Sequence, residues 1–258
     1  VASLVLALAV GLLSLRVKAI FFAMVTLAVA SVMLVLASQL SGLTGGEDGL
    51  TYSAPDLLSP ATALARDADG KVVKLFGTRL NGQLVAYYLV FLGSAALFLL
   101  TRRVTLSPFG TVLQAIRENE ARAEAIGYTV VAYRSFAFVF AAGIASVAGS
   151  LYALWLQYTG PDVTLGFGIM VDILLMVVIG GMGTMWGAVI GATLMVLAQY
   201  YLRDVMQAGA DAVQGLPLLP ELLSPDRWLL WLGLVFILLV YFFPSGIAGS
   251  LLDREARR

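Results

Sequence analysis

Long apolar runs alternate with short polar segments along the whole chain. About 20 apolar residues are needed for a helix to span the hydrocarbon of a bilayer. Strands of a membrane barrel would alternate apolar and polar residues, whereas runs such as FFAMVTLAVASVMLVLA are continuous. The pattern predicts an all-α polytopic bundle of about seven membrane segments, forming a single transmembrane domain over residues 1–258. The predicted segments are Val1–Leu15, Ala19–Leu40, Gln83–Thr101, Arg134–Gln157, Gly166–Gly181, Thr184–Leu202 and Arg227–Phe243.

The chain starts inside an apolar run, with no methionine at its first position. The run has neither the basic stretch before it nor the small-residue cleavage site behind it that mark a signal peptide. We therefore interpret Val1–Leu15 as part of a membrane helix at a shortened or processed terminus, and we expect further apolar segments before Val1.

Three polar segments interrupt the apolar runs, at residues 41–82, 106–133 and 204–226. If the segment 106–133 lies in the cytoplasm, ten of the sixteen basic residues lie on that side, and most acidic residues lie outside. Basic residues usually exceed acidic ones on the cytoplasmic side of membrane proteins. We expect 41–82 and 204–226 to be outer loops, and the C-terminus to be cytoplasmic. The turn Asp67–Gly70 predicts a small hairpin in the first outer loop.

The composition agrees with a protein whose surface faces lipid. The chain is 60% hydrophobic and 12% charged, whereas soluble domains carry roughly 25% charged residues. It contains no histidine and no cysteine. This excludes imidazole and thiolate metal ligands, histidine acid–base chemistry and thiol nucleophiles, so we expect no metal site and no catalytic residue.

The cytoplasmic segment reads SPFGTVLQAIRENEARAEAIGYTVVAYR. Ser107 and Pro108 suit a helix start, Thr111–Ile126 consists of strong helix formers, and Gly127 suits a helix end. A rigid helix tied to two membrane helices can pass a partner's movement to both. The alternative is a solvated loop helix without a partner. The predicted apolar face of this helix comprises Val112, Leu113, Ile116, Ala123 and Ile126.

Three motifs in this sequence resemble one family. The stretch SPFGTVLQAIRENEARAEAIGYTVVAYRSFAFVFAAGIASVAGSLYA is similar to the hallmark segment of membrane permease subunits, of the M type, from branched-chain amino acid ABC importers. GLTGGEDGL and VDILLMVVIGGMGTMWGAVIGA resemble two further motifs of the family, in the same order. The match covers most of Ala19–Phe243. Two departures are the missing upstream apolar segments and Ala188, where a proline is common.

The resemblance implies that the charged cytoplasmic helix is a coupling helix, which docks in a cleft of a separate ATPase subunit. The chain has no G-x-x-x-x-G-K-[ST] phosphate loop, so we do not expect it to be an enzyme or to bind a cofactor. ATP and magnesium would be bound by the partner subunits. By resemblance, the coupling residues are Arg117, Glu118, Asn119, Glu120, Glu124 and Gly127.

The resemblance also implies a set of partners. These are a homologous second permease subunit, two cytoplasmic ATPase subunits, a periplasmic substrate-binding protein and the lipid of a bacterial inner membrane. No nucleic-acid partner is expected.

Two glycine-rich breaks and one acidic residue are candidates for the translocation path. Broken membrane helices expose backbone groups to polar cavities, although tight turns and close helix packing are the alternative explanation. Asp172 lies within an apolar segment, where a charge costs roughly 2.5–3.5 kcal/mol. It would line the path, pair with a partner subunit or lie near the interface. The glycine-rich candidates are Thr44, Gly45, Gly46, Asp48 and Gly49 in the first break, and Gly180, Gly181 and Gly183 in the second.

The leading hypothesis is therefore a permease subunit of an ATP-driven importer for branched-chain or other hydrophobic amino acids. A related permease for urea or short amides remains open. A self-contained secondary transporter or channel would usually carry several intramembrane ionisable residues, whereas we find one. An intramembrane enzyme would need a catalytic constellation, and the sequence offers none.

Overall fold

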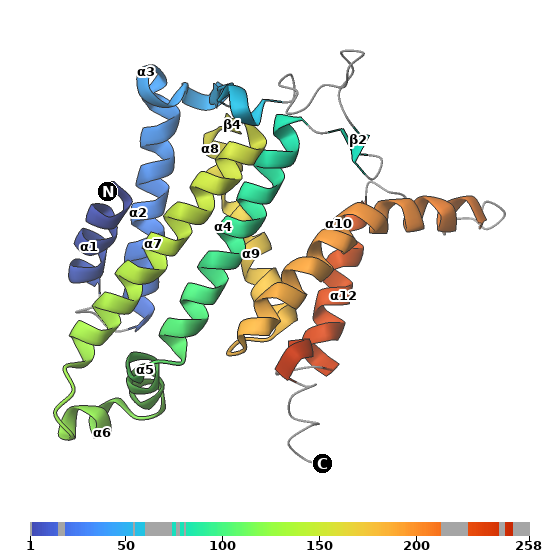
Figure 1. Ribbon diagram of the computed structural model, residues 1–258. Coiled ribbons are helices and arrows are strands. Elements are labelled where there is room, and N and C mark those ends of the chain that lie inside the picture. The colour runs from blue at the N-terminus through green and yellow to red at the C-terminus, as the bar shows by residue number, and fades with distance from the viewer. Residues whose placement is uncertain are drawn as a thin grey trace. The chain divides into compact units, whose positions relative to one another are not determined.

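The computed structural model of this chain describes residues 2–14, 19–53, 55–59, 74–75, 78–79, 81–212, 227–242 and 246–249. They fall into two compact units, Val1–Gly166 (unit 1) and Phe167–Arg258 (unit 2), and each is described by itself. Helices dominate both units, which confirms the predicted all-α class (Figure 1). Arg16, Lys18, the predicted turn Asp67–Gly70 and residues 213–226 lie outside the described residues.

Four long helices form unit 1: α1 (Ala2–Ser14), α2 (Ala19–Gln39), α4 (Gly82–Thr105) and α7 (Val130–Leu156). The central helix is α7, which packs against both α1 and α4 (Figure 1). Ser3 Oγ donates a hydrogen bond of 2.9 Å to Ser146 Oγ, which joins α1 to α7. Small and hydroxyl-bearing residues of this kind let membrane helices approach closely and hydrogen-bond across their interface.

Short elements gather at the two ends of α4 and α7 (Figure 1). One end carries α5 (Pro108–Glu118) and α6 (Glu120–Ala125). Two small antiparallel sheets form, one from β1 and β4 and the other from β2 and β3, in which Leu75 lies opposite Thr78. The other short elements of unit 1 are α3 (Ser41–Thr44), η1 (Gly46–Asp48), β1 (Leu50–Thr51), η2 (Asp56–Leu58), β2 (Lys74–Leu75), β3 (Thr78–Arg79), β4 (Tyr158–Thr159) and α8 (Pro161–Thr164).

Unit 2 contains α9 (Phe167–Gly180), α10 (Met185–Ala212) and α12 (Trp228–Phe242). Here α9 and α10 form a helical hairpin that leaves no room for side chains at its closest points. A Cβ atom on Gly180 would lie 1.8 Å from the Gly187 carbonyl oxygen. A Cβ on Gly191 would lie 1.8 Å from the Met176 carbonyl oxygen.

The first part of the segment predicted as an outer loop at 204–226 is helical, because α10 continues through Ala212. The segment from Leu202 to Ala212 contains no proline, and the prolines that stop helices follow only from Pro217. Polar residues alone do not end a helix, so the helix continues beyond Leu202, where the apolar segment was predicted to end.

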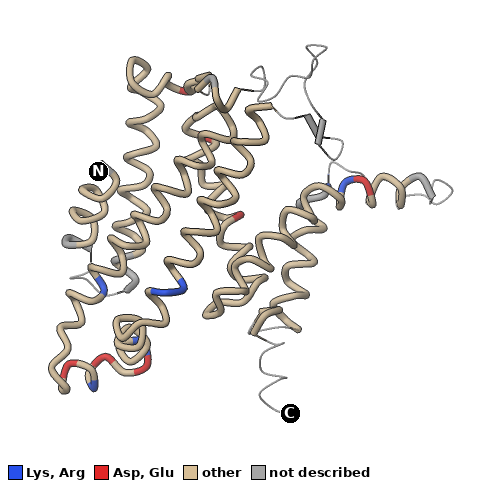
Figure 2. Tube along the Cα trace, viewed as in Figure 1, with Lys and Arg blue, Asp and Glu red and all other residues tan. Residues whose placement is uncertain are grey.

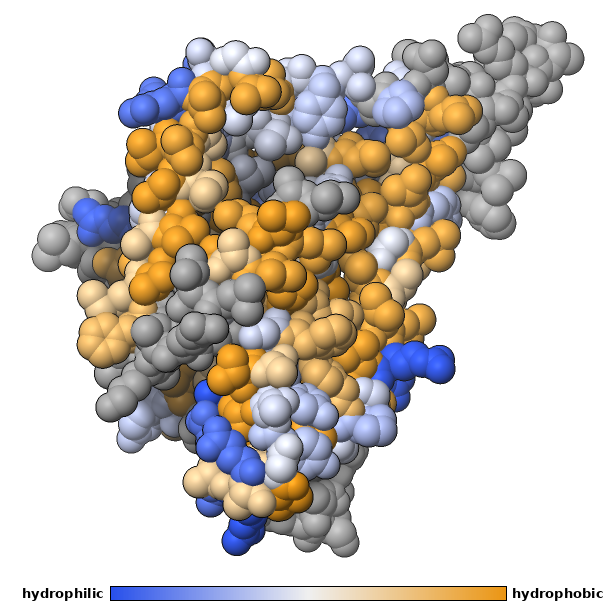
Figure 3. Space-filling view, turned by 90° about the vertical axis from the view of Figure 1, so that its left-hand side faces the viewer, coloured by the Kyte–Doolittle hydropathy of each residue, from blue (hydrophilic) through white to orange (hydrophobic). Residues whose placement is uncertain are grey.

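Five described helical stretches are long and apolar enough to cross a membrane: Gly82–Thr105, Val130–Leu156, Pro161–Gly180, Met185–Ala210 and Leu230–Gly249. The pair Ala23–Gln39 and Ser41–Asp48, bent by 84°, makes a sixth if it counts as one span. The predicted number of about seven is not confirmed, because α1 has only 13 residues. Hydrophobic residues gather over the middle of the face in Figure 3, and hydrophilic residues lie toward its ends.

Replacing Gly191 by alanine is expected to destabilise unit 2, because the added methyl group would collide with the Met176 carbonyl oxygen. Overpacking of this kind costs about 1–3 kcal/mol. The measurement is thermal unfolding of the purified protein in detergent. Gly168→Ala on α9 is the matched control, since no atom lies within 4 Å of its added Cβ. Equal unfolding midpoints for the two variants would contradict the close packing.

Candidate functional site

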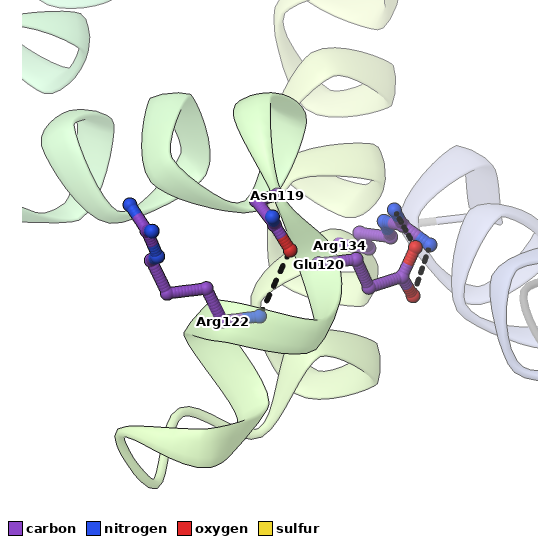
Figure 4. A network of polar contacts seen from close by, with 4 residues as sticks. All are labelled: Asn119, Glu120, Arg122 and Arg134. Atoms are coloured by element: carbon purple, nitrogen blue, oxygen red, sulfur yellow. Dashed lines mark hydrogen bonds and ion pairs between the residues drawn. The ribbon is translucent and has the colours of Figure 1, made fainter.

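The predicted cytoplasmic helix is two helices, α5 and α6, which meet at Asn119. The backbone of Asn119 is extended, with φ −155° and ψ 101°, so the helix from Thr111 to Ile126 that the sequence predicts is wrong at this residue. Its side-chain Oδ1 accepts a hydrogen bond of 3.0 Å from the Arg122 backbone N–H (Figure 4). Asparagine is among the best residues for capping a helix start, which explains why the chain breaks here.

A small apolar core joins the two helices to α7. Its three buried residues are Ile116 of α5, Ala123 of α6 and Val130 of α7, each no more than 3% exposed. Val112 and Tyr133 pack against them. Ile126, predicted on the apolar face, is 70% exposed because α6 ends before it. The chain turns at Gly127, whose φ of 100° favours glycine.

The first turn of α5 is fixed against the ends of α4 and α7. Ser107 is the residue before α5 and Pro108 its first, as predicted. A Cβ on Gly110 would lie 2.0 Å from the Thr105 carbonyl oxygen, so only glycine permits this approach to α4. On the other side, the Phe109 ring stacks on Tyr133 of α7 with ring centroids 5.6 Å apart.

An ion pair ties α6 to α7. Arg134 Nη1 donates to Glu120 Oε1 at 3.0 Å, and Nη2 donates to Oε2 at 2.8 Å (Figure 4). Parallel bonds of this kind are directional as well as attractive. Arg134 was not predicted as a site residue, because a separation of 14 positions between the partners matches no contact within one helix. The one indication of this pair in the sequence is that Glu120 and Arg134 carry opposite charges on the two sides of the turn at Gly127.

All six residues predicted to couple to an ATPase lie at this end of unit 1, and all six are exposed: Arg117, Glu118, Asn119, Glu120, Glu124 and Gly127. Charged residues gather here, while the long helices of unit 1 carry few (Figure 2). Among the residues that the structure describes, the side chains of Glu118 and Glu124 make no hydrogen bond or ion pair. This end therefore presents a preformed, mixed-charge surface.

The first glycine-rich break lies at the opposite end of unit 1. The carbonyl oxygens of Ala37 and Leu40 share the single proton of Thr44 Oγ1, which accepts a bond of 3.3 Å from the Gly46 N–H. Gly45, Gly46 and Gly49 all have φ between 68° and 77°. The threonine therefore supplies hydrogen bonds where the helix is interrupted, and the glycines supply the turn.

A small sheet ties this break to the segment after α7. β1 and β4 pair with Leu50 opposite Thr159, and the Tyr158 hydroxyl donates to the Asp48 carbonyl oxygen at 3.1 Å. A Cβ on Gly49 would lie 2.6 Å from the Thr159 carbonyl oxygen. We call Thr44–Thr51 with Tyr158–Gly160 the clasp. The predicted path residues of this break belong to the clasp, and the Asp48 side chain is exposed.

The second break lies in unit 2, between α9 and α10. Thr184 Oγ1 accepts a bond of 3.1 Å from the Gly187 N–H, which caps α10. Gly181 and Gly183 have φ of 116° and 102°. A Cβ on Gly246 would lie 2.1 Å from the Gly181 Cα. Gly180 and Gly181 are buried in close packing, whereas Gly183 is exposed.

Asp172 lies on α9, partly buried. It precedes Met176 and Gly180 by one and two helical turns, so all three share the face that approaches α10. Within the described part of the chain, its carboxylate makes no hydrogen bond or ion pair. The same part holds no group of three or more acidic residues that could bind a metal ion.

Apolar helices of spanning length, with many exposed hydrophobic side chains, define this chain as a multi-pass helical membrane protein. The family model for the permease component of branched-chain amino acid transport systems matches residues 1–243, and the chain belongs to that family. The resemblance found in the three motifs is thereby confirmed. The family is one of transport permeases rather than enzymes.

The curated relatives that match this chain are also named as branched-chain amino acid transport permeases. The chain is 26% identical to a probable branched-chain amino acid transport permease protein LivM from Methanocaldococcus jannaschii, over 91% of this chain and 61% of that protein. It is 27% identical to the high-affinity permease LivM of Salmonella typhimurium and 26% identical to that of Escherichia coli, over 82% of this chain. The chain spans 51% of each of these two relatives. No solved structure matches it.

The clasp can be tested by disulfide formation, because the chain has no native cysteine. In the variant Leu50→Cys with Thr159→Cys, we expect a disulfide on mild oxidation, since paired Cα atoms in antiparallel strands lie about 4.5–5.5 Å apart. The measurement is the shift in gel mobility after a protease cut between the two positions. Leu43→Cys with Thr159→Cys is the control and should stay reduced. Equal cross-linking of both pairs would contradict the clasp.

Proposed function

We propose that this chain is a permease subunit of an ATP-driven ABC importer that moves branched-chain or other hydrophobic amino acids into the cell. It provides half of the translocation path and docks a separate ATPase through α5 and α6. It lies in a bacterial inner membrane with the α5–α6 end and the C-terminus in the cytoplasm.

The observation that carries this proposal is the preformed α5–α6 pair. Gly110 and Phe109 fix α5 to α4 and α7, and the core around Ile116 fixes α6 to α7. A partner that moves this pair would move both membrane helices with it. The exposed charges of the pair give a partner protein a polar surface to bind, whereas a loop that only connects two helices needs no such construction.

The division of labour follows from what the chain lacks. It has no phosphate-binding loop in its sequence, so two cytoplasmic ATPase subunits would bind ATP and magnesium and supply the power. A homologous second permease would complete the path, and a periplasmic binding protein would deliver the substrate. The exposed residues Arg117, Glu118, Asn119, Glu124 and Gly127 would contact the ATPase.

The proposed path residues are the two glycine-rich breaks and Asp172. A carboxylate without a partner inside a membrane segment is costly, and such residues generally face a bundle interior or a polar cavity. The α-ammonium group of an amino acid is a natural counter-charge for Asp172, whereas urea and short amides carry no charge. The names of the relatives point the same way, so amino acids are favoured over the urea and amide alternative.

Reconstitution tests the proposed function directly. The chain is assembled in proteoliposomes with a candidate second permease, candidate ATPases and a candidate binding protein, and uptake of radiolabelled leucine is measured. We expect uptake to require ATP and to stop when the ATPase phosphate-loop lysine is replaced. Uptake that continues without ATP, driven by an ion gradient, would show a secondary transporter instead.

Asp172→Asn is expected to lower leucine uptake about tenfold while leaving expression and assembly unchanged. Removing a charge from a membrane segment relieves a cost of roughly 2.5–3.5 kcal/mol, so folding should not suffer. The same uptake assay is the measurement. Asp162→Asn, at an exposed position in the first turn of α8, is the control and should behave as the wild type. Normal uptake by the Asp172 variant would place this residue outside the path.

A further inference from the structure

Glu120 differs from the other acidic residues around it, because both of its carboxylate oxygens are already bound within the chain. Arg134 occupies Oε1 and Oε2 through two parallel hydrogen bonds of 3.0 and 2.8 Å. Glu118 and Glu124 flank it in sequence and, in the described part of the chain, have no side-chain partner. A docking carboxylate directs its oxygens at the partner protein, whereas both oxygens of Glu120 already accept a hydrogen bond from Arg134.

The position of the pair is as specific as its geometry. Glu120 is the first residue of α6, directly after the bend at Asn119, and Arg134 lies in the second turn of α7. The connecting residues turn at Gly127, where φ is 100°. The pair therefore bridges the start of α6 to α7 beside the turn that joins the two helices (Figure 4).

Stability alone does not account for this arrangement. The two side chains are 41% and 49% exposed, and exposed ion pairs typically contribute about 0–1 kcal/mol. The buried core of Ile116, Ala123 and Val130 already holds the three helices together. What the bidentate pair adds is direction, because a guanidinium and a carboxylate with two parallel bonds resist rotation about either axis.

We propose that Glu120 and Arg134 are positioning residues that fix the angle of α6 on α7, so that movement of an ATPase against α5–α6 is transmitted to α7. Glu120 is then a strut within the permease and not a docking contact, and Arg134 joins the coupling machinery. This inference rests on the function proposed above and assigns one ion pair a part in it.

A charge swap separates a strut from a docking contact. The variants are Glu120→Arg, Arg134→Glu and the double variant that carries both, each in the complete reconstituted importer. The readout is the amount of leucine taken up per ATP hydrolysed. We expect each single variant to lower this ratio about tenfold, in the range of couplings between contacting residues. The double variant restores it to within about threefold of the wild type, because the pair re-forms with its charges exchanged.

Two further variants sharpen the test. Arg134→Lys keeps the positive charge but cannot make two parallel hydrogen bonds to one carboxylate. The ratio of leucine uptake to ATP hydrolysis should therefore fall between those of the wild type and Arg134→Glu. Arg103→Glu reverses an exposed charge in the last turn of α4, outside α5 and α6, whose side chain has no partner among the described residues, and it should leave the ratio unchanged. ATPase co-purification and thermal unfolding are measured alongside, since a merely structural role would lower these and spare the ratio.

Each outcome bears on one claim. Single variants that impair coupling without rescue by the double variant would make Glu120 a docking contact and overturn the strut. Single variants with a wild-type ratio would remove the pair from coupling altogether. If the wild-type assembly shows no ATP-driven uptake, the proposed function fails, and the strut fails with it.

Discussion

The hydrocarbon of a bilayer offers no hydrogen-bond partner, so each interruption of a helix must satisfy its own backbone groups. Both glycine-rich breaks in this chain meet that constraint with a threonine. Thr44 donates to the carbonyl oxygens of Ala37, in the last turn of α2, and of Leu40, just after it, and accepts from the Gly46 N–H. Thr184 bonds the Gly181 carbonyl oxygen and accepts from the Gly187 N–H. Glycine supplies the turn at each break, and threonine makes it tolerable in a membrane.

The hydrophobic pattern was sufficient to predict the helices, because their apolar length is imposed by the bilayer and read directly from the sequence. Predicted and observed bounds of α9 agree within one residue at each end. Contacts between distant segments were beyond reach. Nothing near Gly49 indicates that Thr159 will lie against it, and nothing near Glu120 indicates Arg134. Such pairings depend on how helices turn about their axes, which a single sequence does not specify.

The bend at Asn119 shows how a local signal can be overlooked. Most of the residues from Thr111 to Ile126 favour helix, so their sum predicts one continuous element. Asparagine, however, bonds nearby backbone groups and favours helix starts, and Glu120 directly after it suits the first turn of a new helix. Asn119 thus signals a helix start, but the helix propensity of its neighbours outweighs this signal when the residues are considered together. In unit 2, Gly180 packs closely against Gly187, a packing role that composition alone does not distinguish from a role in the path.

The central position of α7 has a consequence for how unit 1 is made. The partners Ser3 and Ser146 are 143 residues apart, and Tyr52 and Thr159 are 107 apart. At translation rates of about 5–20 residues per second, the first two helices wait on the order of 10 s in the bilayer before α7 arrives. During that interval the Ser3 hydroxyl and the close face of Gly49 have no native neighbour. The contacts that join α1 and the turn at Gly49 to the segment from α7 to β4 therefore form last in unit 1, after those between α1 and α2.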